Sequence, residues 1–386
     1  MSGTIPTVDN LVIGGGLAGS MVAIRLAAAG RSVTLFEKER AAHHKVCGDF
    51  LSPEAVAYLR QVGVEPLDLG ASTIRFLRLT SRHRVAEAPL PFTAFSLSRY
   101  SLDESMLLRA AQSGCNVRRG VVVEELVAQD HAATVKLRDG RSLSAKTAFL
   151  ATGKHDLRGW DRPPTSQSNF IGFKMHWRLT PFQTDSLNDF IEVFLFPCGY
   201  GGLSLIEDRM ANLCLIVKRT AYRKIGGWPQ LLANILSENR HLRLRLDGAT
   251  PQWQRPLAIS PIPYGYLASP RNNIWYVGDQ AAVIPSFTGD GMSIALHSAA
   301  LASGMFLAGK SADEYHRTLH SQLSHGISLA ALGSLALVTR ASNSLALILL
   351  SLFPDAVRWM ASSTRVPKHA LLELAAPSSS PELSCR

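Results

Sequence analysis

The sequence predicts an α/β fold in which a nucleotide-binding βαβ unit is interrupted by an antiparallel sheet and followed by a helical tail. Residues 10–36 read as an apolar strand, three glycines, an alanine-rich helix and a second strand. Across 170–218 apolar and polar residues alternate between Pro and Gly clusters, which is typical of an antiparallel sheet. A strand at 273–277 and a small-residue helix at 291–307 then resume the first pattern. The sheet is therefore an insertion into the nucleotide-binding unit.

The opening unit carries the glycine pattern of a dinucleotide-binding turn. The strand 10–13 leads into Gly14-Gly-Gly16-Leu-Ala-Gly19, which fits G-x-G-x-x-G and opens the helix 17–29. These glycines permit a tight turn, close approach of a pyrophosphate to the helix N-terminus, and close packing of helix on strand. Glu37 follows about 20 residues later, after the strand 32–36, where a carboxylate can accept ribose hydroxyls. A glycine hairpin, the alternative, does not explain the helix.

Composition and hydrophobic patterning divide the chain into five parts. Its 386 residues exceed the usual span of one compact core, so two linked lobes and a tail are the default. We place the first part of the nucleotide-binding domain at 1–165, with a small excursion near 70–95, the substrate sheet at 166–255, the second part of the nucleotide-binding domain at 256–320, C-terminal helices at 321–375 and a flexible Pro- and Ser-rich tail at 376–386.

Composition narrows the class of partner. With 46% hydrophobic and 18% charged residues the chain is globular. The net charge of +10 fits nucleic acid, an anionic membrane or anionic ligands. However, the basic residues stand in short clusters at 82–84 and 240–245, without the interleaved aromatic residues of nucleic-acid readers, so we expect no nucleic-acid partner. In 240–246 Arg and Leu alternate, which predicts a strand with one wet face.

The cysteines and the first residues bear on location and on metal binding. Five cysteines without paired spacing indicate reduced thiols, and 1–10 has no signal-peptide pattern, so we expect a cytoplasmic protein. His43, His44 and Cys47 stand close together, but a tetrahedral metal site needs four converging ligands and no second pair has suitable spacing. We therefore predict no metal.

A second motif indicates which dinucleotide binds at the first motif. It begins at Val277-Gly-Asp279 and continues through Gly289-Asp-Gly291-Met292, and an NAD enzyme does not need it. With it, residues 8–310 resemble the FAD-dependent oxidoreductases of the geranylgeranyl reductase and aromatic hydroxylase (p-hydroxybenzoate-hydroxylase-like) superfamily. The resemblance implies a Rossmann-type FAD-binding domain with non-covalent FAD. It places Asp279 on the ribityl chain and the backbone from Gly289 to Met292, at a helix N-terminus, against the flavin pyrimidine ring.

Two further segments agree with that resemblance. The stretch from Ser98-Arg99 to Gly114 looks like the family's arginine-led helix, with Arg99 near the FAD phosphates or flavin edge, and 121–125 looks like the strand that meets the adenine. Cys47-Gly48, followed by Leu-Ser-Pro53, looks like the segment of the reductases that approaches the flavin. Cys47 is the candidate catalytic residue, and a merely buried cysteine is the alternative. The predicted cofactor-binding residues are Gly14, Gly16, Ala18, Gly19, Glu37, Lys38, Gly48, Arg99, Val123, Asp279, Gly289, Gly291 and Met292.

The details of the motifs favour the reductase branch. Thr288-Gly-Asp-Gly-Met292 resembles the reductases' Thr-Gly-Glu-Gly-Ile more than the hydroxylases' Gly-Gln-Gly-x-Asn, and the halogenase signature Trp-x-Trp-x-Ile-Pro is absent. One segment departs from the family. Where most members carry Ala-Asp-Gly followed by Ser and Arg, this chain has Ala151-Thr-Gly-Lys-His-Asp-Leu-Arg158, so the resemblance carries over no mode of NAD(P)H use. NAD(P)H and reduced ferredoxin both remain open as electron donors.

These features lead to one main hypothesis and two alternatives. The main one is an oxidoreductase in which FAD exchanges a hydride at N5 with a carbon–carbon double bond of a bulky apolar molecule of prenyl, polyketide-tailed or aromatic type. The first alternative is an NAD(P)H-dependent aromatic monooxygenase that uses a flavin C4a-hydroperoxide. The second is a non-catalytic flavin-binding redox sensor. Oligomeric state stays open.

The C-terminal region raises the question of a membrane. Two apolar stretches, 327–338 and 345–353, flank 339–343, and neither reaches the roughly 20 residues that span a bilayer. A helix pair packed on the domain is the first interpretation. The second is a peripheral membrane contact, in which the helices bury one face while nearby cations meet anionic headgroups.

Overall fold

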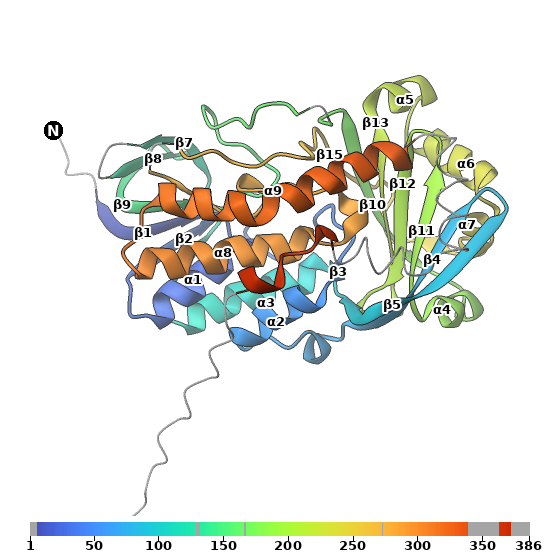
Figure 1. Cartoon of the computed structure of the whole chain (residues 1–386), viewed down its shortest axis with the longest axis horizontal. Coiled ribbons are helices and arrows are strands. Elements are labelled where there is room, and N and C mark those ends of the chain that lie inside the picture. Colours follow the sequence, from blue (N-terminus) through green and yellow to red (C-terminus); the bar gives the residue numbers. More distant parts are fainter. Residues whose placement is uncertain (1–5, 129–131, 166, 272, 339–362, 372–386) are drawn as a thin grey trace, which may run out of the picture.

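The computed structural model describes residues 6–128, 132–165, 167–271, 273–338 and 363–371. Two sheets lie side by side, the first at the left of Figure 1 and the second at the right. The first is seven-stranded, in the order β6 (Asn116–Arg119), β2 (Val33–Glu37), β1 (Thr7–Ile13), β9 (Ser142–Leu150), β8 (Ala133–Leu137) and β7 (Val123–Ala128), with β16 (Trp275–Tyr276) paired to β9.

The first sheet is parallel in its centre and antiparallel at one side. β1 runs parallel to β2 and to β9, and β16 continues this set, whereas β7, β8 and β9 form an antiparallel meander. Every residue of β2 is buried, as expected for a strand covered on both faces. Helices α1 (Leu17–Ala28) and α3 (Arg99–Gln112) cover this sheet, α8 (Gly291–Leu307) packs on α1, and α2 (Pro53–Gln61) packs on α8.

The second sheet has nine strands, most of them antiparallel. Its order is β14 (Thr250–Pro251), β10 (Phe170–Arg178), β13 (Ala211–Lys218), β12 (Gly199–Leu205), β11 (Asp189–Phe196), β4 (Ser72–Ser81), β5 (Arg84–Ser96) and β3 (Phe50–Leu51), with β15 (Leu257–Ile259) paired to β10. One face packs on an apolar cluster shared with α5 (Arg219–Ile225), α6 (Trp228–Glu238) and α7 (Arg240–Arg245). The short α4 (Pro181–Leu187) precedes β11.

The segment near 70–95 is larger than the small excursion that the sequence predicts. It forms the two long strands β4 and β5, and β4 pairs in parallel with β11 of the second sheet. Alternate side chains such as Leu79, Ala86 and Ala88 are buried in a separate apolar cluster, which also contains Ile262 and Tyr264. The second sheet is therefore built from two separate stretches of chain.

The prediction of a strand at 240–246 is wrong, because this stretch contains the helix α7. Asn239 caps the helix, since its Oδ1 accepts a hydrogen bond of 2.9 Å from the Leu242 amide. Leu242 and Leu246, four residues apart, both face the apolar cluster. The Arg–Leu alternation fits both periods, and the N-cap together with tertiary packing selects the helix.

The C-terminal stretch 327–338 is almost entirely the second half of one long helix, α9 (Ala312–Leu337), which runs from the first sheet towards the second (Figure 1). It begins with a capping box at Ser311 and crosses the boundary that the sequence suggested at 320. Ile327 and Ala330 are buried, whereas Leu332 is 67% exposed. No helix in the described ranges is long and apolar enough to cross a membrane. The second predicted stretch, 345–353, lies outside them.

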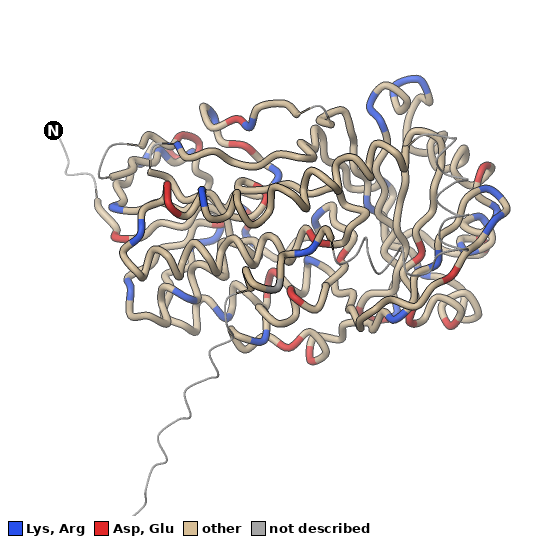
Figure 2. The backbone as a smooth tube through the Cα atoms, viewed as in Figure 1, with Lys and Arg blue, Asp and Glu red and all other residues tan. Residues whose placement is uncertain are grey.

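Charged residues are distributed over both lobes. Figure 2 shows Lys and Arg scattered along the backbone and interleaved with Asp and Glu. Many of the cations have a nearby carboxylate, as in the exposed pairs Arg138–Glu124 and Arg141–Asp139.

Candidate active site

A cavity of about 580 Å³ lies between the two sheets. Its size falls in the range of about 300–1,000 Å³ that is usual for cofactor and ligand sites. At one end it meets the glycine turn and Glu37, in its middle Cys47 to Phe50, and at its far end the second sheet. Of the predicted residues, the following line it: Gly14, Gly16, Ala18, Glu37, Lys38, Cys47, Gly48, Arg99, Val123, Asp279, Gly289, Gly291 and Met292.

Gly19 is the predicted residue that does not line the cavity. A Cβ on Gly19 would lie 1.9 Å from the carbonyl oxygen of Gly14, so its role is the close packing of α1 on the turn. Gly14 itself has φ +107°, and a Cβ there would lie 2.4 Å from the carbonyl oxygen of Ala151. Both positions therefore require glycine for reasons inside the protein.

The N-terminus of α1 is prepared for an anion. No described side chain caps it, and its first turn contains no acidic residue. Two cations stand beside Gly16, because a Cβ built there would lie 3.5 Å from Arg99 Nη2 and 3.6 Å from Lys45 Nζ. Free N–H groups at a helix N-terminus together with two cations fit the pyrophosphate of FAD.

Asp103 holds both cations in place. It accepts hydrogen bonds of 2.7 and 2.9 Å from the Arg99 guanidinium, and its Oδ2 lies 2.7 Å from Lys45 Nζ. Burial alone would raise the pKa of Asp103, but Arg99 and Lys45 outweigh it and lower that pKa. The carboxylate therefore stays ionised and orients the cations. The sequence did not single out Lys45 or Asp103.

Glu37 is held at the end of β2. Its Oε2 accepts a 2.8 Å hydrogen bond from the Gly15 amide, and its Oε1 accepts one of 2.9 Å from Glu39. The carboxylate is thus fixed beside the glycine turn with lone pairs left to accept ribose hydroxyls. Lys38 and Val123, at the start of β7, line the same end of the cavity.

Asp279 lies just after β16 and forms an ion pair that the sequence did not predict. Its Oδ2 is 3.2 Å from Lys154 Nζ, and Arg162 donates a 2.8 Å hydrogen bond to its backbone carbonyl. Burial opposes the charge of Asp279, but Lys154 and Arg162 outweigh it and lower the pKa of the carboxyl. The residue that departs from the family pattern, Lys154, therefore meets the carboxylate assigned to the ribityl chain.

We expect Asp279→Ala to weaken FAD binding by roughly tenfold to a hundredfold, or about 1.5–3 kcal/mol, because it removes a charge-assisted hydrogen bond to the ribityl chain. Flavin fluorescence titration of the apoprotein measures the dissociation constant. Asp139→Ala is the control, because Asp139 forms an exposed ion pair with Arg141. An unchanged dissociation constant for the Asp279 variant would show that this carboxylate does not hold FAD.

The N-terminus of α8 meets the middle of the cavity. Gly289 has φ +76°, and a Cβ there would lie 2.7 Å from the ring of Phe50. Gly291 and Met292 follow as the first residues of this 17-residue helix, with no side-chain cap from the described part of the chain. The Asp290 side chain instead accepts a 3.0 Å hydrogen bond from Thr364, and burial raises its pKa to about 7. The helix dipole is therefore available to a flavin ring.

Cys47 is half-buried and lines the cavity. Its sulfur accepts a 3.4 Å hydrogen bond from the Asp49 amide, and Cys214 of β13 also lines the cavity. A catalytic role for Cys47 stays a prediction. Among the described residues no group of three or more His, Cys, Asp or Glu could hold a metal ion.

Comparison with known proteins agrees with this geometry. Residues 7–148 match the FAD binding domain family. The menaquinone reductase of Mycolicibacterium smegmatis is 26% identical over 78% of this chain and 76% of its own length. That of Mycobacterium tuberculosis is 25% identical, over 84% of this chain and 82% of its own length. The chain is an FAD-dependent oxidoreductase.

Solved structures share the fold of this oxidoreductase. A myxobacterial chondrochloren halogenase superposes with a TM-score of 0.73 at 17% identity, over 96% of each chain. A flavoprotein/dehydrogenase from Cytophaga hutchinsonii superposes with a TM-score of 0.70 at 16% identity, over 95% of this chain and 98% of that one. At these identities the likeness concerns the fold alone.

Proposed function

We propose that this FAD-dependent oxidoreductase transfers a hydride to a carbon–carbon double bond of an apolar molecule with an isoprenoid-quinone character. The apolar far wall of the cavity carries the proposal. It is formed by the second sheet and the residues after β15, namely Gly172, Ile216, Ile259, Ile262 and Tyr264. The names of the menaquinone reductases that resemble this chain support a quinone as the substrate class.

The tyrosine hydroxyls at that wall are hydrogen-bonded within the protein. Tyr264 donates a 2.8 Å hydrogen bond to Ser286, and the Tyr200 hydroxyl is 3.2 Å from the same Ser286 oxygen. With its hydroxyl satisfied, Tyr264 offers the ligand its apolar ring. Gly172 lets the side chains of Ile259 and Ile262 pack closely on the sheet, since a Cβ there would lie 3.2 and 3.1 Å from them. An apolar chain can therefore lie along the wall with its double bond towards Cys47 and Gly289.

The cofactor and the protein have separate roles in this arrangement. FAD, when bound, supplies the hydride chemistry. The protein holds the cofactor through the glycine turn, Glu37 and Asp279, and it excludes water with the apolar wall. The backbone at Gly289 and Gly291 would hold the flavin ring.

The test is an anaerobic half-reaction. The enzyme is reduced with NADPH, NADH or reduced ferredoxin, mixed with an isoprenoid quinone, and followed by return of flavin absorbance. The product is then exposed to air, which reoxidises a quinol ring but not a saturated tail. We expect a product that keeps two added hydrogen atoms. A product that returns to its starting mass indicates ring reduction, and one that gains an oxygen atom only in air indicates a monooxygenase. Either would overturn the proposal.

We also propose a peripheral membrane contact beside the cavity. Leu332 and Leu335 of α9 are 67% and 43% exposed. Nearby, Val338 packs in the same buried cluster as Ile262 and Tyr264 of the cavity wall. A substrate with an apolar tail would reach the flavin from the bilayer without crossing water, which makes such a contact useful.

Flotation with liposomes tests this contact. Full-length protein is expected to float with anionic vesicles at low salt and largely to detach at high salt, where the Debye length falls below about 10 Å. Leu332→Glu/Leu335→Glu should stay at the bottom of the gradient while it keeps its flavin. Leu67→Glu is the control, since Leu67 is 50% exposed in a 3₁₀ turn outside α9. If the native chain never floats, the contact does not exist.

A further inference from the structure

The face of the second sheet that looks towards the cavity carries a column of polar residues. Along β10, Lys174 and His176 follow Gly172 at every second position. The register with β13 places Cys214 opposite Lys174 and Asn212 opposite His176. The intervening side chains of Phe173, Met175 and Trp177 face the apolar cluster on the other side. The polar column therefore begins where the apolar cavity wall ends.

A fully buried ion pair joins this column to the segment that carries Cys47. Lys174 Nζ lies 2.5 Å from Asp49 Oδ2, and both side chains are 0% exposed. Asp49 lines the cavity and has φ +58°. Taking such a pair out of water has a cost that its attraction often does not exceed, and apolar residues of similar size are frequently as stable. Stability alone therefore does not explain the pair.

The surroundings of the pair contain several unsatisfied polar groups. Asp49 Oδ1, His176 Nε2, His44 Nδ1 and Asn212 Oδ1 are all buried and have no hydrogen-bond partner in the described part of the chain. They are neighbours, because His176 Nε2 is 4.0 Å from Asp49 Oδ2 and the rings of His44 and His176 lie 4.8 Å apart. Buried polar atoms are rarely left unpaired away from functional sites.

The same groups connect the cavity to the surface. His44 is half-buried and stacks on Tyr100, which is 45% exposed, at a ring distance of 4.9 Å. Trp253 covers both histidines, with ring distances of 5.0 Å to His44 and 4.7 Å to His176. His44 therefore lies between the exposed Tyr100 and the buried His176, and it also lines the cavity.

Burial and the charge of Lys174 keep both imidazoles neutral near pH 7. Burial, followed by the charge of Lys174, lowers the pKa of His176 to about 3 and that of His44 to about 4. The charge of Glu207 raises the pKa of His44. Of the charges that act on the pKa of Asp49, Arg99 lowers it and Glu207 raises it. A neutral imidazole has one donor and one acceptor nitrogen, so each ring can take up a proton on one side and release one on the other.

We infer that the Lys174–Asp49 pair is the proton source for the reaction in the cavity, recharged from solvent through His176 and His44. The inference rests on the proposed function, because saturating a double bond needs a proton as well as a hydride. The hydride, with its electron pair, leaves the reduced flavin and bonds to one carbon. The electrons of the double bond then form the second C–H bond with a proton from Asp49.

Protein side chains supply the proton for the reaction and regain it from solvent. Asp49 is ionised in the resting pair, so it takes up a proton from the Lys174 ammonium and passes that proton to the carbon. One N–H bond of Lys174 breaks, and Lys174 is left neutral beside ionised Asp49. A solvent proton arriving through His44 and His176 restores the ammonium. Asp49, which lines the cavity, is thus a catalytic residue, whereas Lys174 and His176 act through it.

Rapid mixing of the reduced holoenzyme with an isoprenoid quinone, without oxygen, tests the proton source. The double variant Asp49→Asn/Lys174→Met removes both charges together and leaves no unpaired ion. We expect it to slow flavin reoxidation at least about a hundredfold, which is the usual size of a general-acid effect. Its FAD dissociation constant should stay within about threefold of native. Met175→Leu is the control, since Met175 follows Lys174 in β10 and its side chain faces the apolar cluster on the other side of the sheet.

His176→Phe tests the connection to solvent and keeps the aromatic packing against Trp253. A single turnover should proceed at the native rate, because Lys174 already carries the proton that this turnover needs. The steady-state rate should fall at least about tenfold, because each later turnover needs a new proton from solvent. An independent reading needs no substrate. In ¹⁵N-histidine spectra of the resting enzyme, the His176 ring signal, assigned by its loss in His176→Phe, should exchange with solvent at least about tenfold more slowly in His44→Phe.

The possible failures can be told apart. If the native reduced enzyme is not reoxidised by the quinone, the proposed function fails, and unchanged exchange in His44→Phe then rejects the solvent path as well. If the native enzyme is reoxidised and its product keeps two added hydrogen atoms in air, but the double variant reacts within about threefold of it, the proton source is wrong and the proposed function stands. If the double variant does not fold, equal loss of single-turnover and steady-state rates in His176→Phe rejects the relay.

Discussion

Gly16→Ala is expected to leave the fold intact and to weaken FAD binding at least about a hundredfold, or about 2.8 kcal/mol. Gly16 has φ −74° and ψ −174°, a conformation that alanine adopts readily. Its new methyl group would make only ordinary contacts, at 3.5 Å with Arg99 Nη2 and 3.6 Å with Lys45 Nζ. The same methyl group would occupy the space between the two cations and the α1 N-terminus, where the pyrophosphate must come close to the backbone.

Gly304→Ala is the matched control for this variant. Gly304 lies within α8, and a Cβ there would have 4.0 Å to its nearest neighbour, Arg25. FAD affinity should be unchanged, and the free energy of unfolding should rise by about 0.5–1 kcal/mol because alanine favours the helix. Flavin titration and thermal unfolding of both apoproteins give the comparison. Binding of FAD to the Gly16 variant within about threefold of native would place the pyrophosphate elsewhere.

The parts of this site that the sequence predicts are those with short-range physical causes. The turn around Gly14 and the helix α1 follow from glycines and apolar residues within about one helix length of each other. The start of α8 at Gly291 follows in the same way from a glycine pair ahead of a small-residue run. Since parallel strands end at one edge of a sheet, Glu37 at the end of β2 and Asp279 after β16 are brought to the same cavity.

The parts that the sequence does not predict depend on pairings between distant residues. Lys154 and Asp279 are ion-paired across 125 positions, and so are Asp49 and Lys174. No local pattern marks such partners, because which lysine meets which carboxylate depends on the register of strands such as β10 and β13. The pairing of β4 with β11 is of the same kind.

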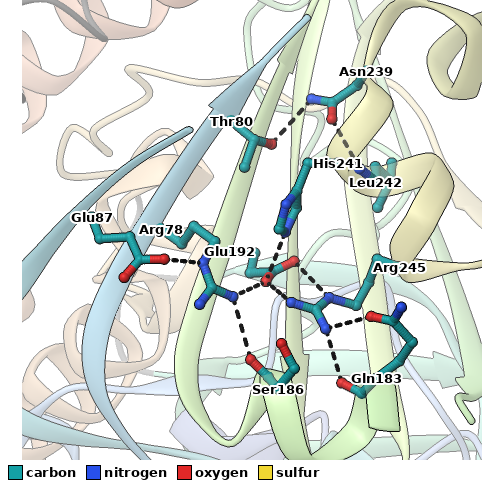
Figure 3. A network of polar contacts seen from close by, with 10 residues as sticks. All are labelled: Arg78, Thr80, Glu87, Gln183, Ser186, Glu192, Asn239, His241, Leu242 and Arg245. Carbon is teal, nitrogen blue, oxygen red and sulfur yellow. Dashed lines mark hydrogen bonds and ion pairs between the residues drawn. The ribbon is translucent and has the colours of Figure 1, made fainter. Parts of the chain in front are cut away.

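The network around Glu192 is another long-range arrangement, and it stabilises the second lobe (Figure 3). Glu192, on β11, accepts hydrogen bonds from Arg78 of β4 and from Arg245 of α7, at 2.5 and 3.2 Å for the latter. His241 lies 3.1 Å from the same carboxylate. Arg245 also donates to Gln183 of α4. One buried carboxylate thus holds two strands and two helices.

Glu192→Gln is expected to lower the free energy of unfolding by about 3–5 kcal/mol, because Glu192 and Arg245 are each only 2% exposed and the variant leaves two arginines without their buried counter-ion. Denaturant unfolding at pH 7 measures the loss. Glu124→Gln, which breaks the exposed pair with Arg138, should cost no more than about 1 kcal/mol. Equal losses in the two variants would show that the network contributes little.

The difference in free energy of unfolding between native protein and Glu192→Gln should also depend on pH, which gives a second, independent test. Burial would raise the pKa of Glu192, but the hydrogen bonds from His241 and Arg245 outweigh it and lower that pKa from 4.5 to about 2. A carboxyl with a depressed folded-state pKa contributes stability above its unfolded pKa and loses it as the pH falls through the folded value. The gap between native protein and Glu192→Gln should therefore be constant from pH 8 to about pH 5 and shrink steadily from there towards pH 2. A gap that widens on acidification would mean that Glu192 is protonated in the folded protein, and the ion-pair account of this lobe would then be wrong.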